Sequence, residues 1–432
     1  MKPHARHWIL PLLTLAACGA NYDPPSLIVP DKVRVLGVRA DPPSIGLAAD
    51  TTLTMLVAGP AEDVTLCHAW AFCPFTWSKN GAYTCIDPEL LVPLGTDAVA
   101  HVGIAAVFSS LSHAADVFAR LGLQTPTSSA PAVTDPCAAA GGGGGIPFAN
   151  ANLPDAYVLF QVATAAQFGG VCPQPEVVLA APCADRQTCL QGFKRLAVAA
   201  VPEASCGAFD AATDKNCSVS DPCDTKPVCG CDGRTYDSDC ARVAAKVSKR
   251  AAGACRDRNP ELSGVAVKWP VPDRSNPPPL GALNPSGEYV VPAGEAGLIA
   301  WPADVTLVLL PDETVELLPR WPGATKEYVG KSADPAAPPV YETLLFSWFT
   351  TGGTYLKDRS YDAYPENVLT VSAANTDGTP APLRFWLVAR DGRNGTTWLR
   401  RDISVRNPTG TPVDGRHPLC RGEKPTAGCP AP

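Results

Sequence analysis

Histidine is scarce in this chain, with six among 432 residues. The patterns HExxH and GxSxG are both absent, so the chain lacks the zinc-binding helix and the serine turn that those patterns build. No catalytic, metal or cofactor site follows from its motifs, and we expect a protein that is not an enzyme. A hydrolase built from scattered residues is the alternative, because a triad is recognised by geometry and not by spacing.

Charge is scarce as well. Charged residues make up 18% of the sequence, and the net charge is −7. Proteins that bind nucleic acids usually show a basic surface that neutralises phosphates, so we expect no nucleic acid partner. Beyond the first residues, no run is apolar enough to predict a transmembrane helix, which needs about 20 apolar residues.

The first residues have the layout of a secretory signal peptide. Lys2 and Arg6 precede an apolar run at 8–17, WILPLLTLAA, which is too short to span a bilayer. The run ends in the string LAAC at Cys18, which resembles the lipobox of bacterial lipoproteins. The resemblance implies removal of residues 1–17 and lipidation of Cys18, palmitate included, so that the lipid anchors the protein to a membrane. An ordinary signal peptide that ends near a cysteine is the alternative.

In bacterial lipoproteins, an aspartate after the acylated cysteine favours retention at the inner membrane. Gly19 follows Cys18 here, so the resemblance implies the outer membrane as the location in the cell envelope.

The remaining cysteines fit an exported protein. Setting Cys18 aside leaves sixteen of the 17 cysteines. An even number of cysteines in an exported chain predicts disulfides, here up to eight.

Short segments of alternating polarity predict a mainly β fold. Segments 32–40, 51–58 and 65–72 have the pattern of half-buried strands. Proline, with 46 residues, is about twice as frequent as the usual ~5%, which favours strands joined by loops. The exceptions are segment 109–121, whose apolar residues recur at helical spacing, and a loop with five consecutive glycines at 141–145.

A weak internal repeat indicates two copies of one β-sandwich, at 31–204 and 260–407. Three segments recur in the same order: 67–72 with 345–350, 157–165 with 383–390, and 193–201 with 398–405. The first pair carries Trp70 and Trp348. A tryptophan on a middle strand resembles the immunoglobulin-like sandwich, and convergent strand patterning is the alternative. We expect residues 18–30 to form a proline-rich tether and 408–432 a Pro/Gly-rich tail.

Six cysteines cluster between the two expected sandwiches. The most specific motif among them is Pro227-Val228-Cys229-Gly230, followed by Asp232-Gly233, Thr235-Tyr236 and Cys240. It resembles the Kazal-type domain of serine-protease inhibitors and follistatin-like proteins, and implies a small α+β module at 206–256. A segment this short buries too little core to fold without crosslinks. Asp232-Gly233 predicts a hairpin turn, and Asp237 or Ser238 a cap for a helix at 241–249.

The resemblance also implies the disulfide pairing and the binding loop. It pairs Cys223 with Cys240 and Cys229 with Cys255, which leaves Cys217 with Cys231, whereas six cysteines alone allow 15 pairings. In the tail, Cys420 and Cys429 can close a small loop. The loop that binds proteases in Kazal inhibitors corresponds here to Asp224, Thr225 and Lys226. This loop is about two residues shorter than the inhibitor pattern, and Ser238 stands where inhibitors have a bracing asparagine.

These features lead to two functional hypotheses. The first is a non-enzymatic, membrane-anchored lipoprotein that presents the Kazal-like module and the sandwiches to a protein partner at the cell envelope. The second is a tethered serine-protease inhibitor that acts through the Cys223–Cys229 loop. A zinc site formed by Cys229, Cys231 and Cys240 is disfavoured because no histidine lies nearby and the compartment is oxidising.

Overall fold

The computed structural model places most of the strands and helices of the chain. It describes residues 26–29, 32–45, 50–59, 64–79, 82–121, 156–183, 185, 187–198, 207–210, 228–231, 235–252, 255, 258–271, 282–283, 289–290, 297–322, 328–330, 340–371, 381–406, 416–422, 427 and 429. The described residues form a mainly β protein, as expected. Among them, no helix has both the length and the apolar character needed to cross a membrane.

The first copy of the repeat is a sandwich of two sheets. One sheet has the order β1-β3-β8, with β1 at Arg34–Asp41, β3 at Thr51–Ala58 and β8 at Val99–Val102. The other has the order β2-β10-β9-β4-β7, with β2 at Ser44–Ile45, β10 at Cys189–Val198, β9 at Ala156–Thr164, β4 at Leu66–Cys73 and β7 at Val92–Gly95.

The second copy has two five-stranded sheets. One has the order β17-β14-β19-β25-β23, with β17 at Leu298–Trp301, β14 at Gly264–Lys268, β19 at Thr314–Arg320, β25 at Asn367–Thr370 and β23 at Thr354–Tyr355. The other has the order β18-β27-β26-β22-β24, with β18 at Leu307–Leu309, β27 at Thr396–Val405, β26 at Ala381–Arg390, β22 at Leu345–Thr350 and β24 at Arg359–Tyr361.

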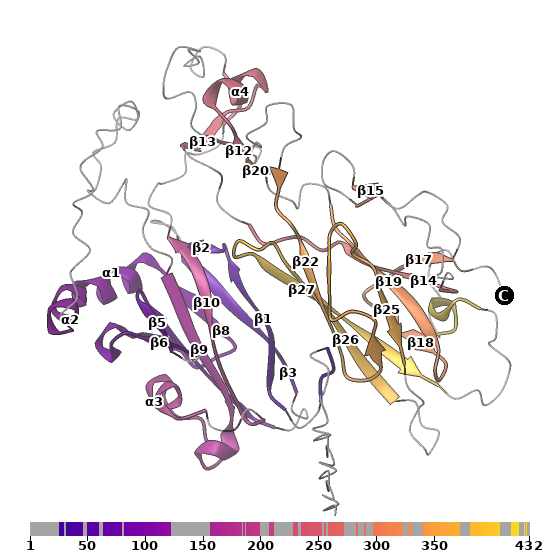
Figure 1. Cartoon of the computed structure of the whole chain (residues 1–432), viewed down its shortest axis with the longest axis horizontal. Helices are drawn as coiled ribbons and strands as arrows, with labels where there is room; N and C mark the ends of the chain where they lie inside the picture. Colours follow the sequence, from indigo (N-terminus) through magenta and orange to yellow (C-terminus); the bar gives the residue numbers. More distant parts are fainter. Residues whose placement is uncertain are drawn as a thin grey trace, which may run out of the picture.

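Strand order confirms the predicted repeat. In each copy the last strand pairs antiparallel with the strand before it and parallel with a short early strand, β2 in the first copy and β18 in the second. The three repeated segments lie on equivalent strands: β4 and β22, β9 and β26, β10 and β27. This is the order of an immunoglobulin-like sandwich, and Figure 1 shows the two copies side by side, in indigo to magenta and in orange to yellow.

A buried tryptophan marks the same place in both cores. Trp70 on β4 and Trp348 on β22 are each 0% exposed. Their indole nitrogens donate to different acceptors, Trp70 to the carbonyl of Asp97 at 2.7 Å and Trp348 to Ser360 Oγ at 2.9 Å. Each ring therefore fills the space between its sheets while its polar edge stays hydrogen-bonded, as a buried indole requires.

Part of the expected tether belongs to the fold. Ile28 donates its N–H to the carbonyl of Thr350 at 2.7 Å, and Thr350 donates to the carbonyl of Ser26 at 2.9 Å. Ile28 is 1% exposed and packs in a cluster that includes Leu36 of the first copy and Trp386 of the second. Residues 26–29 thus form part of the joint between the copies, because their apolar side chains gain more from burial than from exposure.

Helical segments and a hairpin decorate the first copy. The predicted helix at 109–121 is two helices, α1 at Ile104–Ser112 and α2 at Ala114–Arg120. Val107 packs in the sandwich core, whereas Val117 packs on Leu90 in a separate cluster, so one straight helix cannot reach both. The first copy also carries a hairpin of β5 at Thr76–Lys79 and β6 at Ala82–Cys85. Two 3₁₀ turns, η1 at Pro88–Leu90 and η2 at Ala165–Phe168, and the helix α3 at Pro175–Ala180 complete its described elements.

The small module lies at the upper end of the molecule in Figure 1. It has a sheet of order β12-β11-β13 and one helix, with β11 at Val228–Gly230, β12 at Thr235–Tyr236, α4 at Asp239–Ala244 and β13 at Lys249–Ala252. The remaining elements are β15, β16, β20, β21 and η5, at Ala282–Leu283, Tyr289–Val290, Tyr328–Gly330, Val340–Tyr341 and Pro418–Cys420.

The predicted helix of the module is too long. Ser238 caps it as one of the two expected residues, since its Oγ accepts from the N–H of Ala241 at 3.1 Å. However, α4 ends at Ala244, and Lys246 adopts a positive φ of 55°. That left-handed turn reverses the chain into β13, so the end of the predicted 241–249 segment forms a strand instead.

Candidate functional site

The small module formed by β11, β12, α4 and β13 is built around the β11–β12 hairpin. Val228 pairs with Tyr236 and Cys229 with Thr235, which fits the predicted reversal of the chain between these strands. Strand β13 pairs with the other edge of β11. Val228 and Cys229 are 5% and 1% exposed, so this short strand forms the middle of the module.

A buried arginine holds the helix of the module to its sheet. Arg242 is 1% exposed, and its Nε donates to Asp239 Oδ1 at 2.6 Å. Its Nη1 donates to the carbonyl of Val247, and Lys249 Nζ lies 3.8 Å from Asp239 Oδ2. These charge-assisted contacts join α4, the following turn and β13, which compensates for the few apolar side chains of so small a unit.

The disulfides agree with the predicted pairing wherever both partners are described. Cys229–Cys255 and Cys420–Cys429 are both formed, with Cα separations of 4.5 and 5.6 Å. Cys231 and Cys240 are also disulfide-bonded. Their expected partners, Cys217 and Cys223, lie outside the described residues.

Two other predicted sites also lie outside the described residues. Cys18, the expected lipidation site, precedes the first described residue. The expected protease-binding residues Asp224, Thr225 and Lys226 lie in the gap that ends before Val228. Their roles therefore stay predictions from the resemblance.

Three disulfides in the first copy had no pairing assigned from the sequence. They are Cys67–Cys172, Cys73–Cys85 and Cys183–Cys189. Cys73–Cys85, which closes the region of the β5–β6 hairpin, and Cys183–Cys189 join residues 12 and 6 positions apart, and this short spacing is the sequence signal that could have indicated local pairs. Cys67–Cys172 joins residues 105 positions apart, a pairing that only the folded sheet brings together.

The histidines of the described residues do not gather into a site. Burial lowers the pKa of His68, and the nearby charge of Asp97 opposes this shift. His101 lies beside Thr52, with 3.3 Å between Nδ1 and the hydroxyl oxygen. Within the described part of the chain, no group of three or more His, Cys, Asp or Glu side chains has an arrangement that fits a metal ion.

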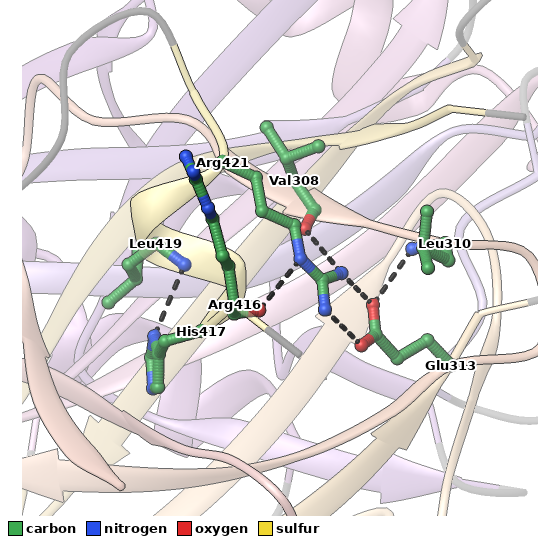
Figure 2. A network of polar contacts seen from close by, with 7 residues as sticks. All are labelled: Val308, Leu310, Glu313, Arg416, His417, Leu419 and Arg421. Carbon is green, nitrogen blue, oxygen red and sulfur yellow. Dashed lines mark hydrogen bonds and ion pairs between the residues drawn. The ribbon is translucent and has the colours of Figure 1, made fainter. Parts of the chain in front are cut away.

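The C-terminal tail docks on the second copy through an ion pair that the sequence did not reveal. The Arg421 side chain is 1% exposed, and its Nη1 and Nη2 donate to the two oxygens of Glu313 at 2.5 and 2.8 Å. Its Nε donates to the carbonyl of Arg416 at 2.9 Å, as Figure 2 shows. The expected tail at 408–432 is thus fixed to the sandwich over residues 416–422.

His417 forms the second attachment of the tail. Its Nε2 lies 3.2 Å from the carbonyl oxygen of Val267 and 3.1 Å from that of Gly297. Its Nδ1 accepts the N–H of Leu419 at 3.3 Å. Only the neutral ring with its proton on Nε2 satisfies all three contacts. Burial accordingly lowers the pKa of His417, although the two carbonyls oppose the shift.

Comparisons with known proteins add no family. No protein-family description matches the chain, and no curated protein matches it. A solved chain of a 1.5-MDa bacterial ice-binding adhesin, described for its retention at the host cell surface, is 11% identical and covers 88% of this chain and 98% of its own length. Its TM-score is 0.16, and a likeness at that level carries no argument about fold or function.

Proposed function

We propose that this protein is a non-enzymatic lipoprotein of the cell envelope, anchored by lipid on Cys18, that presents a Kazal-like module to a protein partner. The observation that supports this function best is the placement of the module. Figure 1 has α4, β12 and β13 at one end of the molecule and the indigo segment 26–29 near the other. An anchor attached ahead of residue 26 would therefore leave the module pointing away from the membrane.

The anchor is tested by fractionating cells that export the protein. The Cys18→Ala variant should lose palmitate incorporation and move from the outer-membrane fraction to the soluble fraction. Gly19→Ala, which leaves the acylated residue in place, serves as the matched control and should stay membrane-bound. A Cys18→Ala protein that remains with the membrane after export would contradict the proposal.

The partner is tested by affinity capture from envelope extracts. The purified protein should retain a specific protein, and a variant with a disrupted module, Arg242→Met, should lose it. Thr397→Ala, on the second copy, is the matched control and should retain the partner. Equal capture by the Arg242→Met variant would show that the module is not the binding element.

A second function, inhibition of a serine protease through the Cys223–Cys229 loop, is favoured by the string at 227–240 and by the β11–β12 hairpin that follows the loop. The full protein is titrated against trypsin-, elastase- and subtilisin-like proteases. Lys226→Ala should weaken inhibition of a trypsin-like enzyme, whereas Lys246→Ala should not. Cleavage after Lys226 without slowing of any protease would rule this function out.

A further inference from the structure

One surface of the first copy is nearly free of charge. We call residues 165–182, which form η2, the following loop and α3, the apolar cap. Glu176 is the only charged residue in its sequence. Val171 is 75% exposed and Val177 is 54% exposed, whereas the outward side of a surface helix normally carries polar side chains. Exposed apolar side chains that gather on one surface mark sites of contact with a protein or a membrane.

An open groove of about 690 Å³ lies between η2 and α3. Most of its lining is apolar, with contributions from Phe168, Val177, Ala180, Ala181 and Pro182. Gln167 also lines it and already donates to the carbonyl of Pro182 at 3.2 Å. The groove therefore offers few polar groups to orient a small molecule, and covering it with apolar material would release water from its wall.

Two disulfides hold the cap on the sheet beneath it. Cys172 in the loop is bonded to Cys67 of β4, and Cys183, directly after the cap, is bonded to Cys189 of β10. Val178 is 0% exposed and packs in a cluster with Cys67, so α3 buries one of its two valines and exposes the other. The outward side chains are thus held in place by the fold, and a rigid surface loses little entropy when it binds.

The cap lies at the end of the molecule where the described chain begins. Val33 donates its N–H to the carbonyl of Gln187 at 2.8 Å, and Gln187 follows the cap by five residues. The N-terminal segment therefore passes beside the cap. Figure 1 shows α3 and the indigo segment at 26–29 toward the lower end of the molecule, opposite α4. An anchor on Cys18 would bring this end of the protein close to lipid.

We propose that the apolar cap rests on the lipid surface to which Cys18 is anchored, with Val171 and Val177 inserted at the level of the headgroups. This inference rests on the proposed anchor, because the anchor brings the cap to a membrane. The contact is apolar, since Glu176 is the one charge of the cap, and it should not require anionic lipid. A second point of contact would fix the orientation of the protein, with the module directed away from the membrane.

The contact is tested without the anchor, so that the two proposals can fail separately. The chain 19–432, which keeps every described residue and lacks Cys18, is mixed with vesicles of phosphatidylcholine and phosphatidylethanolamine at about 5 mM lipid, and bound protein is measured by sedimentation. Val171→Ser combined with Val177→Ser should weaken partitioning about thirtyfold, because two largely exposed valines lose their apolar transfer. Val177→Leu should strengthen it about fourfold, the effect of one buried methylene.

Tyr361→Ser combined with Tyr364→Ser is the matched control. These tyrosines are 53% and 71% exposed, close to the exposure of the two valines. Tyr361 pairs with Leu345, at the opposite end of β22 from Thr350, the residue that is bonded to the N-terminal segment. The control should therefore bind vesicles like the unchanged chain.

Equal sedimentation of the unchanged chain and the two-valine variant would overturn the proposal. Self-association without vesicles that this variant abolishes would overturn it as well, because it would assign the cap to a second copy. Binding that appears only after phosphatidylglycerol is added would show an electrostatic contact and would also overturn it. A chain that fails to bind vesicles while Cys18 is acylated in cells removes the cap proposal and leaves the anchor standing.

Discussion

Removing the Arg421 side chain should release the C-terminal tail. In Arg421→Met, the buried carboxylate of Glu313 loses both guanidinium contacts and keeps the N–H of Leu310, at 2.8 Å. The change also removes a cation–π contact, in which the guanidinium lies 5.2 Å from the ring centre of Trp269. Breaking one side of a buried ion pair costs about 3–5 kcal/mol, which exceeds what one 3₁₀ turn gains from its own hydrogen bonds.

The consequence is measured by amide exchange. The N–H of Cys420 donates to the carbonyl of His417 at 2.7 Å, and we expect this bond to open when the tail is released. A loss of 3 kcal/mol corresponds to about a hundredfold lower protection factor. Arg416→Met is the control, because Arg416 takes part through its carbonyl, which the substitution keeps.

A double substitution separates the ion pair from simple packing. Arg421→Met combined with Glu313→Gln should recover part of the lost protection, because a neutral amide is cheaper to leave buried than a carboxylate. If the protection factor of the Cys420 N–H in Arg421→Met stays within threefold of its value in the unchanged protein, the reasoning is refuted. So would a double variant that is less protected than Arg421→Met alone.

Three further predictions concern the tail, the joint and the module. Burial lowers the pKa of His417, so its ring binds a proton more tightly when the tail is undocked than when it is docked. Docking should therefore be strongest above about pH 6.5 and weaken as the pH falls below that value. The amide-exchange protection factor of Leu419 should show this pH dependence, and His417→Gln should remove it. Ile28→Ala should lower the stability of the joint by about 2–5 kcal/mol, seen as an earlier guanidinium transition, with half-buried Leu27→Ala changing it less. Arg242→Met, which leaves Asp239 without its guanidinium, should raise the rate of proteolysis within the module by about a hundredfold.

Strand identity was predictable where periodicity is local. The segment predicted at 51–58 is β3 at Thr51–Ala58, and each repeated pair of segments falls on equivalent strands. Successive side chains of a strand point to opposite faces of the sheet. A sheet with one buried face therefore shows alternating apolar and polar residues within a few consecutive positions of the sequence. The segment predicted as one helix at 109–121 is helical on both sides of His113, but its periodicity did not show the break there, nor that the first helix begins at Ile104 and packs Val107 in the sandwich core while Val117 packs in a separate cluster.

The joint and the docked tail were not predictable, because their partners are far apart in the sequence. Arg421 meets Glu313 across 108 positions, and Arg390 meets the carbonyl of Leu36 across 354. Asn259 likewise donates to the carbonyl of Ala40 at 2.7 Å and accepts from the N–H of Thr396 at 2.9 Å. Contacts between residues so far apart leave no pattern of spacing or composition in the sequence. A proline-rich segment such as 18–30 has the composition of a linker whether or not part of it packs on the fold.

The docking of residues 26–29 also changes what a lipid on Cys18 would do. Only seven residues separate Cys18 from Ser26, and a fully extended chain spans at most about 3.3–3.6 Å per residue. The reach from the lipid to the joint is then below about 30 Å, so the protein would stay close to the membrane. Because Ile28 and Thr350 are hydrogen-bonded, a pull on the anchor would act on the joint itself, and through it on both copies. The module at the opposite end would be held at a defined height instead of swinging on a free tether.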